Sequence, residues 1–125
     1  MGSSQVATVR DVIRDLVRAF ETQPGKDFCA EFETPNSPTA WVQIVSGQIN
    51  FYYPFKRNPD EQLRGLPVPP RPAMRCVEWE ANINATLEGT DLNDVAWLSQ
   101  FVDGLFTTLY ALGPDYKLKT DIIEL

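Results

Sequence analysis

The stretch that decides the fold is Cys76-Val-Glu-Trp-Glu-Ala-Asn-Ile-Asn-Ala-Thr-Leu-Glu88. Apolar residues occupy every second position of it, separated by polar ones: Val77, Trp79, Ala81, Ile83, Ala85 and Leu87. Because successive side chains of a strand point to opposite faces, this alternation predicts one half-buried strand of about eleven residues. Trp79 and Ile83 are therefore predicted to be core residues. The other face, rich in carboxylates and amides, is expected to be wet, as is typical of an antiparallel sheet.

The rest of the chain predicts helices on both sides of the strands. Residues 5–22 and 91–112 carry apolar side chains at the i, i+3, i+4, i+7 spacing of a helix. Further strands are predicted at 27–33, 40–46, 48–54 and 115–123. The order α-β-β-β-β-α-β predicts a single α+β domain over residues 1–125, with an antiparallel sheet of about five strands. The helices are expected to cover one face of that sheet, residues 1–4 to be disordered, and residues 55–75 to form a long proline-rich loop.

The composition indicates an acidic, globular chain. It has 125 residues, a net charge of −6 and an isoelectric point of about 4.5. Such a chain repels a phosphate backbone, so no nucleic-acid partner is expected. No apolar run approaches the roughly 20 residues of a membrane helix, and the first residues lack the pattern of a signal peptide. We therefore expect a cytoplasmic protein with no membrane partner.

The residue types that commonly carry catalysis are sparse. The chain has no histidine, and hence neither the base of a catalytic triad nor an imidazole metal ligand. Its two cysteines, Cys29 and Cys76, lack a CxxC spacing, and the sequence leaves open whether they lie close together. Two cysteines are a poor disulfide framework, so reduced thiols are expected.

Carboxylates on the polar face of the strands are the other candidates for chemistry. Glu78 and Glu80, next to Glu31 and Glu33 of another strand, could do acid–base work or hold a hard cation. Carboxylates that alternate along open strands are, however, more typical of a solvated face. No catalytic residue, metal or cofactor is therefore expected, and the protein is interpreted as a non-enzyme.

The proline-rich segment carries the clearest recognition motif. Arg64-Gly-Leu-Pro67-Val-Pro69-Pro70 fits the RxxPxxP pattern that a polyproline helix presents to an aromatic groove. Residues 56–75 hold five basic and two acidic groups, whereas residues 76–125 hold two basic and nine acidic ones. The segment could bind a partner, or its charge could pair with the acidic face of its own domain. The residues predicted to bind a partner are Arg57, Arg64, Pro67, Pro70, Arg71 and Trp97.

Trp97 is among the predicted partner-binding residues because residues 92–110 carry apolar side chains over a wide arc of the predicted helix. A helix of this kind is buried on two sides, and in a small domain the second side can be a partner, which predicts a homodimer. The other interpretation is a broad core helix under a twisted sheet. As an alternative function, a curved sheet with a helix across it could hold a small apolar ligand in a pocket between them. That pocket would be lined by Trp41, Phe51, Tyr53 and Trp79.

Two segments carry a resemblance to a known family. The small acidic chain, the order helix–strands–helix and the ending Leu-Tyr-Ala-Leu-Gly-Pro (109–114) of the last helix resemble type III secretion chaperone-like and YbjN-like domains. The run Trp41-Val-Gln-Ile-Val, followed by Gly47-Gln-Ile-Asn, is similar to their central hairpin, and the likeness spans residues 5–112. The insert at 55–75 and the strand after the last helix depart from that pattern. The resemblance implies a non-enzymatic, dimeric domain that binds an extended segment of a partner along a hydrophobic surface.

The expected function is therefore a protein-interaction domain of chaperone-like, adaptor or immunity type. Its partner is expected to bind through an apolar surface and through the acidic face, because an acidic surface steers basic partners.

Overall fold

The computed structural model describes residues 5–35 and 37–125, so the predicted disorder of residues 1–4 lies outside the described residues. In chain order, the elements are α1 (Gln5–Thr22), β1 (Phe28–Thr34), β2 (Ser37–Val45), β3 (Gln48–Phe51), α2 (Pro59–Arg64), β4 (Arg75–Glu80), β5 (Asn84–Glu88), α3 (Val95–Gly104), the π-helical turn η1 (Leu105–Leu109) and β6 (Lys119–Glu124). The strands form one sheet in the order β4-β5-β3-β2-β1-β6, and every neighbouring pair is antiparallel. The predicted α+β class is confirmed.

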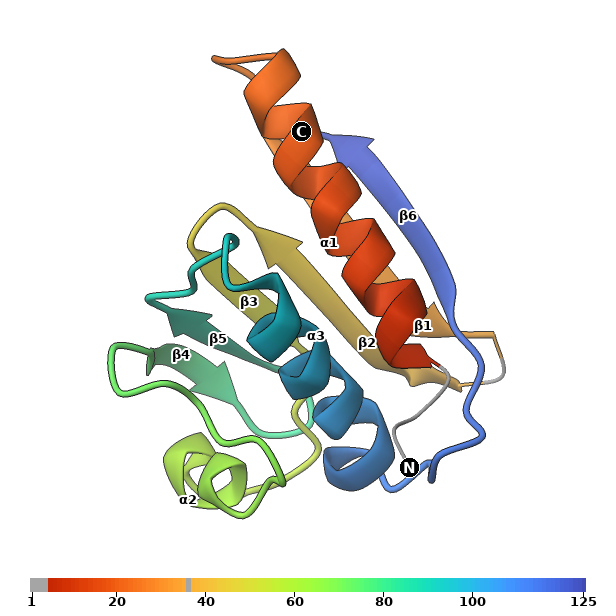
Figure 1. Ribbon diagram of the computed structural model, residues 1–125. Coiled ribbons are helices and arrows are strands. Elements are labelled where there is room, and N and C mark those ends of the chain that lie inside the picture. Colours follow the sequence, from red (N-terminus) through yellow and green to blue (C-terminus); the bar gives the residue numbers. More distant parts are fainter. Residues whose placement is uncertain (1–4, 36) are drawn as a thin grey trace.

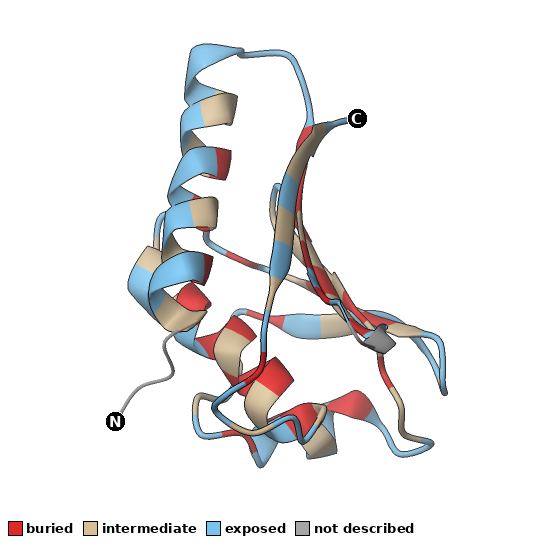
Figure 2. Cartoon of the chain, turned by 90° about the vertical axis from the view of Figure 1, so that its right-hand side faces the viewer, coloured by how far each residue is buried: buried red, intermediate tan, exposed pale blue. Residues whose placement is uncertain are grey.

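The molecule has two layers, with α1 and α3 on one face of the sheet (Figure 1). Every third or fourth residue of α1 faces inward, and Val9, Ile13 and Leu16 are fully buried. Figure 2 shows the buried residues on the surfaces where the helices and the sheet face each other. The largest fully buried side chains in this layer include Phe32, Phe51, Tyr53, Phe101 and Phe106.

The stretch 76–88 is a hairpin and not the single strand that its alternation predicts. β4 and β5 pair from Glu80 opposite Asn84 back to Arg75 opposite Glu88. The turn between them places Asn82 at a φ of 62°, and the amide of Ile83 donates to the carbonyl of Glu80 at 3.1 Å. Asparagine enters the left-handed region more readily than most residues, which favours a turn here. The sheet therefore has six strands, one more than expected.

The prediction that Trp79 and Ile83 are core residues is wrong. Ile83 lies in the turn and is 50% exposed, while Trp79 is 38% exposed on the edge strand of the sheet. Trp79 lies opposite the buried Ala85, and its ring meets the ring of Tyr53 edge-on at 5.7 Å. With β4 at the edge, the outer side of this indole stays open to solvent. Only the second half of the alternating stretch, at Ala85 and Leu87, is buried as predicted.

The proline-rich segment is not a loop throughout, because it contains the short helix α2. The side chain of Asn58 accepts a hydrogen bond from the amide of Asp60 at 2.9 Å, and Pro59 occupies the first turn, where its missing N–H is not needed. Leu63 and Leu66, together with Met74 near β4, are buried in the common core. The segment is therefore anchored to the domain at several points along its length.

The last helix is shorter than predicted and changes form before it ends. α3 passes into η1, and the amide of Tyr110 then donates to the carbonyl of Leu105 at 2.9 Å. A π-turn is rare and introduces one extra residue per turn. Downstream, Tyr116 is buried and its hydroxyl donates to Asp103 at 2.6 Å, so the final strand begins only at Lys119.

Candidate interaction surfaces

The sheet face that points away from α1 and α3 is open to solvent in the described part of the chain (Figure 2). Along β2, β3 and β5, fully or almost fully buried residues alternate with residues of intermediate exposure, and the latter make up the open face. Apolar residues occupy the inner positions and mostly polar residues the outer ones, as expected for an antiparallel sheet with one wet face. We call this surface the open face.

A single row of polar side chains crosses all six strands on the open face. In strand order from one edge to the other, the paired residues are Asp121, Glu31, Gln43, Asn50, Thr86 and Glu78. Gln43 donates to Glu31 at 3.1 Å, and Thr86 and Asn84 donate to Asn50 at 3.1 and 2.9 Å. Asn50 in turn lies 3.5 Å from the side-chain oxygen of Gln43. We call this set the polar row.

The open face is strongly acidic. Its carboxylates are Glu31, Glu33, Glu78, Glu80, Glu88 and Asp121. Lys119 lies 3.7 Å from Glu33, and Arg75 stands opposite Glu88 at the sheet edge. The prediction that Glu78 and Glu80 lie next to Glu31 and Glu33 is wrong, because β5, β3 and β2 lie between β4 and β1. The four carboxylates nevertheless belong to the same face of the sheet. They alternate with amides on an exposed sheet.

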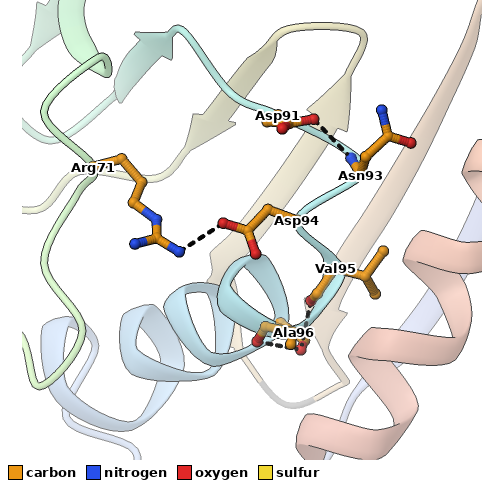
Figure 3. A network of polar contacts seen from close by, with 7 residues as sticks. Arg71, Asp91, Asn93, Asp94, Val95 and Ala96 are labelled. Carbon is orange, nitrogen blue, oxygen red and sulfur yellow. Dashed lines mark hydrogen bonds and ion pairs between the residues drawn. The ribbon is translucent and has the colours of Figure 1, made fainter.

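The predicted partner residues Arg71 and Trp97 contact each other within the chain. Figure 3 shows Arg71 reaching from the proline-rich segment to Asp94 at the start of α3, with 2.7 Å between the guanidinium nitrogen and the carboxylate oxygen. The guanidinium carbon lies 5.1 Å from the centre of the Trp97 ring, which stacks on Phe101 with centroids 5.1 Å apart. The apolar arc that motivated a homodimer is thus partly covered by the chain itself.

The remaining residues predicted in this segment are exposed or half-buried and do not form one continuous polyproline ligand. Arg64 lies in the last turn of α2, so the arginine of the RxxPxxP pattern is helical. Pro67 lines a groove of about 370 Å³ beside α1 and α3, whereas Pro70 lines a different hollow beside α2. The side chain of Arg57 is exposed, and its carbonyl accepts a hydrogen bond from the hydroxyl of Tyr53.

The four residues of the predicted ligand pocket are not brought together. Phe51 and Tyr53 are fully buried, with ring contacts from Phe55 and Trp79 to Tyr53. Trp41 alternates with the buried Val42 and so lies on the open face, across the sheet from Phe51.

A hollow that the sequence did not indicate lies between α1, the β2–β3 turn and the loop after β5. It has a volume of about 470 Å³ and is lined by Val17, Phe20, Glu21, Ser46, Gly47, Thr90, Leu92 and Asn93. Thr90 is buried, and its hydroxyl has no hydrogen-bond partner among the described residues. The walls come from three segments far apart in the chain, which is why no local pattern signals this hollow.

The two cysteines are far apart and free. Cys29 lies in β1 and Cys76 in β4, with β5, β3 and β2 between them. Burial raises the pKa of the Cys29 thiol to about 11 and also raises the pKa of Cys76 above its ordinary value. Both groups are therefore predominantly thiols at neutral pH, and the thiol is a poor nucleophile.

Two further findings concern metals and membranes. Across residues 5–35 and 37–125, no three cysteine, aspartate or glutamate side chains gather as metal ligands. Within the same ranges, none of the helices has the length and apolar character needed to cross a bilayer.

Searches with this chain found no matching family model, no matching curated protein and no matching solved structure.

Proposed function

We propose that this domain is a non-enzymatic, cytoplasmic protein-binding module whose open face takes a basic segment of a partner protein. The observation that carries the proposal is the polar row, which crosses all six strands of the open face and is flanked by further carboxylates.

The charge of the open face decides between possible occupants. Glu31, Glu78 and Asp121 lie in one row, so a second copy placed face to face would set carboxylates against carboxylates. Like charges brought together at an interface make the free energy of binding less favourable by roughly several kcal/mol. A segment rich in lysine or arginine reverses the sign of that interaction and also gains in association rate.

One half-buried aromatic residue, Trp41, adds apolar contact to the same face, because it alternates along β2 with the buried Ala40 and Val42. Aromatic rings can pack against the aliphatic stems of lysine and arginine and attract their cationic heads. The open face therefore offers carboxylates for the cationic heads of a basic segment and an aromatic ring for its aliphatic stems.

The proposal is tested by selecting binders from a random peptide library displayed on phage, with the full chain as bait. Selected peptides are then measured by fluorescence anisotropy against a triple variant of the polar row, Glu31→Gln, Glu78→Gln and Asp121→Asn. The matched control, Asp11→Asn, Asp15→Asn and Asp115→Asn, removes the same charge from exposed positions outside the open face.

We expect the selected peptides to be enriched in lysine and arginine and to lose at least about tenfold in affinity to the polar-row variant only. Peptides without basic enrichment would contradict the proposal. Equal losses in both variants would also contradict it, because they would indicate non-specific attraction to an acidic protein.

The hollow of about 470 Å³ supports a second candidate, binding of a small apolar ligand. Its volume falls within the roughly 300–1,000 Å³ of small-molecule sites, and Phe20 and Leu92 supply apolar walls. A fragment screen by protein-detected NMR tests this candidate. Signals of Val17, Phe20 and Leu92 should shift together with one fragment class, and Val17→Trp should abolish those shifts.

A further inference from the structure

A second hollow, of about 310 Å³, lies between α2 and the chain that returns to β4. Its lining residues are Asp60, Arg64, Pro70, Arg71, Met74 and Arg75. Three arginines thus meet one carboxylate in a chain whose net charge is −6. We call this site the arginine hollow.

Two of the three arginines have side chains that are available to bind a ligand. Within the described part of the chain, the guanidinium groups of Arg64 and Arg75 have neither an ion-pair nor a hydrogen-bond partner. Arg71 is bound to Asp94 on one side, at 2.7 Å. A guanidinium has five N–H donors, so the contact with Asp94 leaves Arg71 with further donors.

The backbone that carries these arginines is well anchored. Leu63 is fully buried one residue before Arg64, and Met74 is buried one residue before Arg75. A turn in which the amide of Met74 donates to the carbonyl of Arg71 at 2.9 Å connects the second and third arginines. Pro70 and Pro72 restrict the backbone on either side of Arg71. An anchored frame of this kind lowers the ordering cost of binding.

We propose that the arginine hollow binds a phosphate monoester. The planar fork of a guanidinium matches two oxygens of a phosphate group and forms short, charge-assisted hydrogen bonds with them. Arg64 and Arg75 together with the carboxylate of Asp60 leave a surplus of one positive charge. Arg71, whose charge is balanced by Asp94, adds its remaining N–H donors, so the hollow attracts an anion. Arg75 stands opposite Glu88 at the edge of the open face, whereas Asp60, Arg64 and Arg71 belong to α2 and the segment after it, so the hollow borders the open face. The proposal does not rest on what binds to the open face.

Binding at this site has a consequence for α3. Arg71 bridges the hollow and the start of α3, because its guanidinium binds Asp94 (Figure 3). The guanidinium carbon also lies 5.1 Å from the centre of the Trp97 ring. An anion that recruits Arg71 competes with Asp94 for the same guanidinium. The environment of the Trp97 ring should then change when the hollow is filled.

The test uses the full chain and follows the arginine Nε–Hε signals by NMR during titration. The probes are inorganic phosphate, free O-phosphoserine and a capped peptide with a central phosphoserine. The variant Arg64→Gln/Arg75→Gln is compared with Arg14→Gln/Arg18→Gln, which removes the same charge from exposed positions of α1. Thermal melts establish that both variants are folded.

We expect saturable shifts of Arg64, Arg71 and Arg75 with all three probes, and a loss of about tenfold or more in affinity in the hollow variant only. Equal affinity for the three probes identifies the phosphate group itself as the ligand, whereas tighter binding of the peptide identifies a phosphorylated protein. Shifts that do not saturate, or equal losses in both variants, would overturn the proposal.

Discussion

The hydroxyl of Tyr110 donates a hydrogen bond of 2.8 Å to the carbonyl of Tyr52, and so ties the π-helical end of the α3 helix to the sheet. The same hydroxyl lies 3.0 Å from the carbonyl of Trp41, which already accepts the amide of Tyr52. A hydroxyl has one hydrogen and can donate only one strong hydrogen bond at a time. The carbonyl of Trp41 already has the amide of Tyr52 as a donor, so the carbonyl of Tyr52 is the one that needs the hydroxyl of Tyr110.

Tyr110→Phe should therefore lower the free energy of unfolding by about 1–3 kcal/mol, because it leaves a carbonyl without its partner. The matched control is Tyr52→Phe, whose hydroxyl has no recorded hydrogen bond within the described residues. Its effect should stay within about 0.5 kcal/mol. Urea denaturation of the three proteins measures both values, and equal effects would show that the hydroxyl of Tyr110 carries no stabilising bond.

Two buried tyrosines should make the fold sensitive to alkali. Burial raises the pKa of Tyr53 to about 12 and raises that of Tyr110 well above 10, the value for an accessible tyrosine. Below pH 10, both states of the chain keep these protons and the contribution to stability is complete. As the pH rises from 10 towards 12, the unfolded chain loses the protons first, so stability falls.

Denaturation curves at pH 9, 10 and 11 test this dependence. The variant Tyr53→Phe/Tyr110→Phe should lose less stability over that range than the parent chain, because neither position can then ionise. If the parent and the variant lose stability in parallel, other groups such as the lysines cause the alkaline effect.

The corrected hairpin can be tested with two isoleucines that differ in burial. Ile49 of β3 is fully buried, whereas Ile83 in the turn is 50% exposed. Ile49→Ala should cost about 2–5 kcal/mol, the range of large-to-small changes in a core. Ile83→Ala should cost no more than about 0.5 kcal/mol. Comparable losses in chemical denaturation would mean that residue 83 is in the core after all.

The contact between Arg71 and Asp94 should be a modest stabilising interaction. Both side chains are partly exposed, so the coupling free energy from a double-mutant cycle with Arg71→Ala and Asp94→Ala should be about 0.2–1 kcal/mol. It should weaken as salt is added. Arg71→Lys should recover only part of it, because a lysine lacks the planar fork that lies over Trp97. A coupling of zero at low salt would contradict the geometry.

The thiols should remain reduced and differ in reactivity. Three strands separate β1 from β4, so Cys29 and Cys76 are on the order of 19 Å apart, whereas a disulfide needs Cα atoms within about 7 Å. With Ellman's reagent at pH 8, the half-buried Cys76 should react slowly and the buried Cys29 only after unfolding. Rapid reaction of both thiols in the native protein would show that the β1 strand opens readily.

The alternation over 76–88 was sufficient to predict an antiparallel sheet, yet it concealed a turn. Period-two patterning can continue through a short turn when the turn residues happen to alternate, as Ala81 and Ile83 do around Asn82. A period-two pattern does not indicate whether a strand lies at the edge of its sheet. Trp79 is exposed because β4 is an edge strand. Asn58-Pro59 is a readable helix start, but the helix after it spans six residues and is too short for a periodic signal.

The sequence predicts less about the surfaces of the protein than about its core. Glu31 and Glu78 were correctly placed on polar strand positions, but their membership of one row depends on the order and register of strands that are far apart in the chain. The basic character of residues 56–75 was evident from composition. The meeting of Arg64, Arg71 and Arg75 around one hollow depends on α2 turning the chain back towards β4.

The polar row also has a direction. Thr86 and Asn84 donate to Asn50, Asn50 donates towards Gln43, and Gln43 donates to Glu31, so every donor in the series points the same way. The series ends on carboxylate oxygens at Glu31, while Glu78 beyond Thr86 adds acceptors at the other end. A molecule that lies along this row therefore meets acceptors at both ends, and it must bring its own N–H or O–H groups to match them.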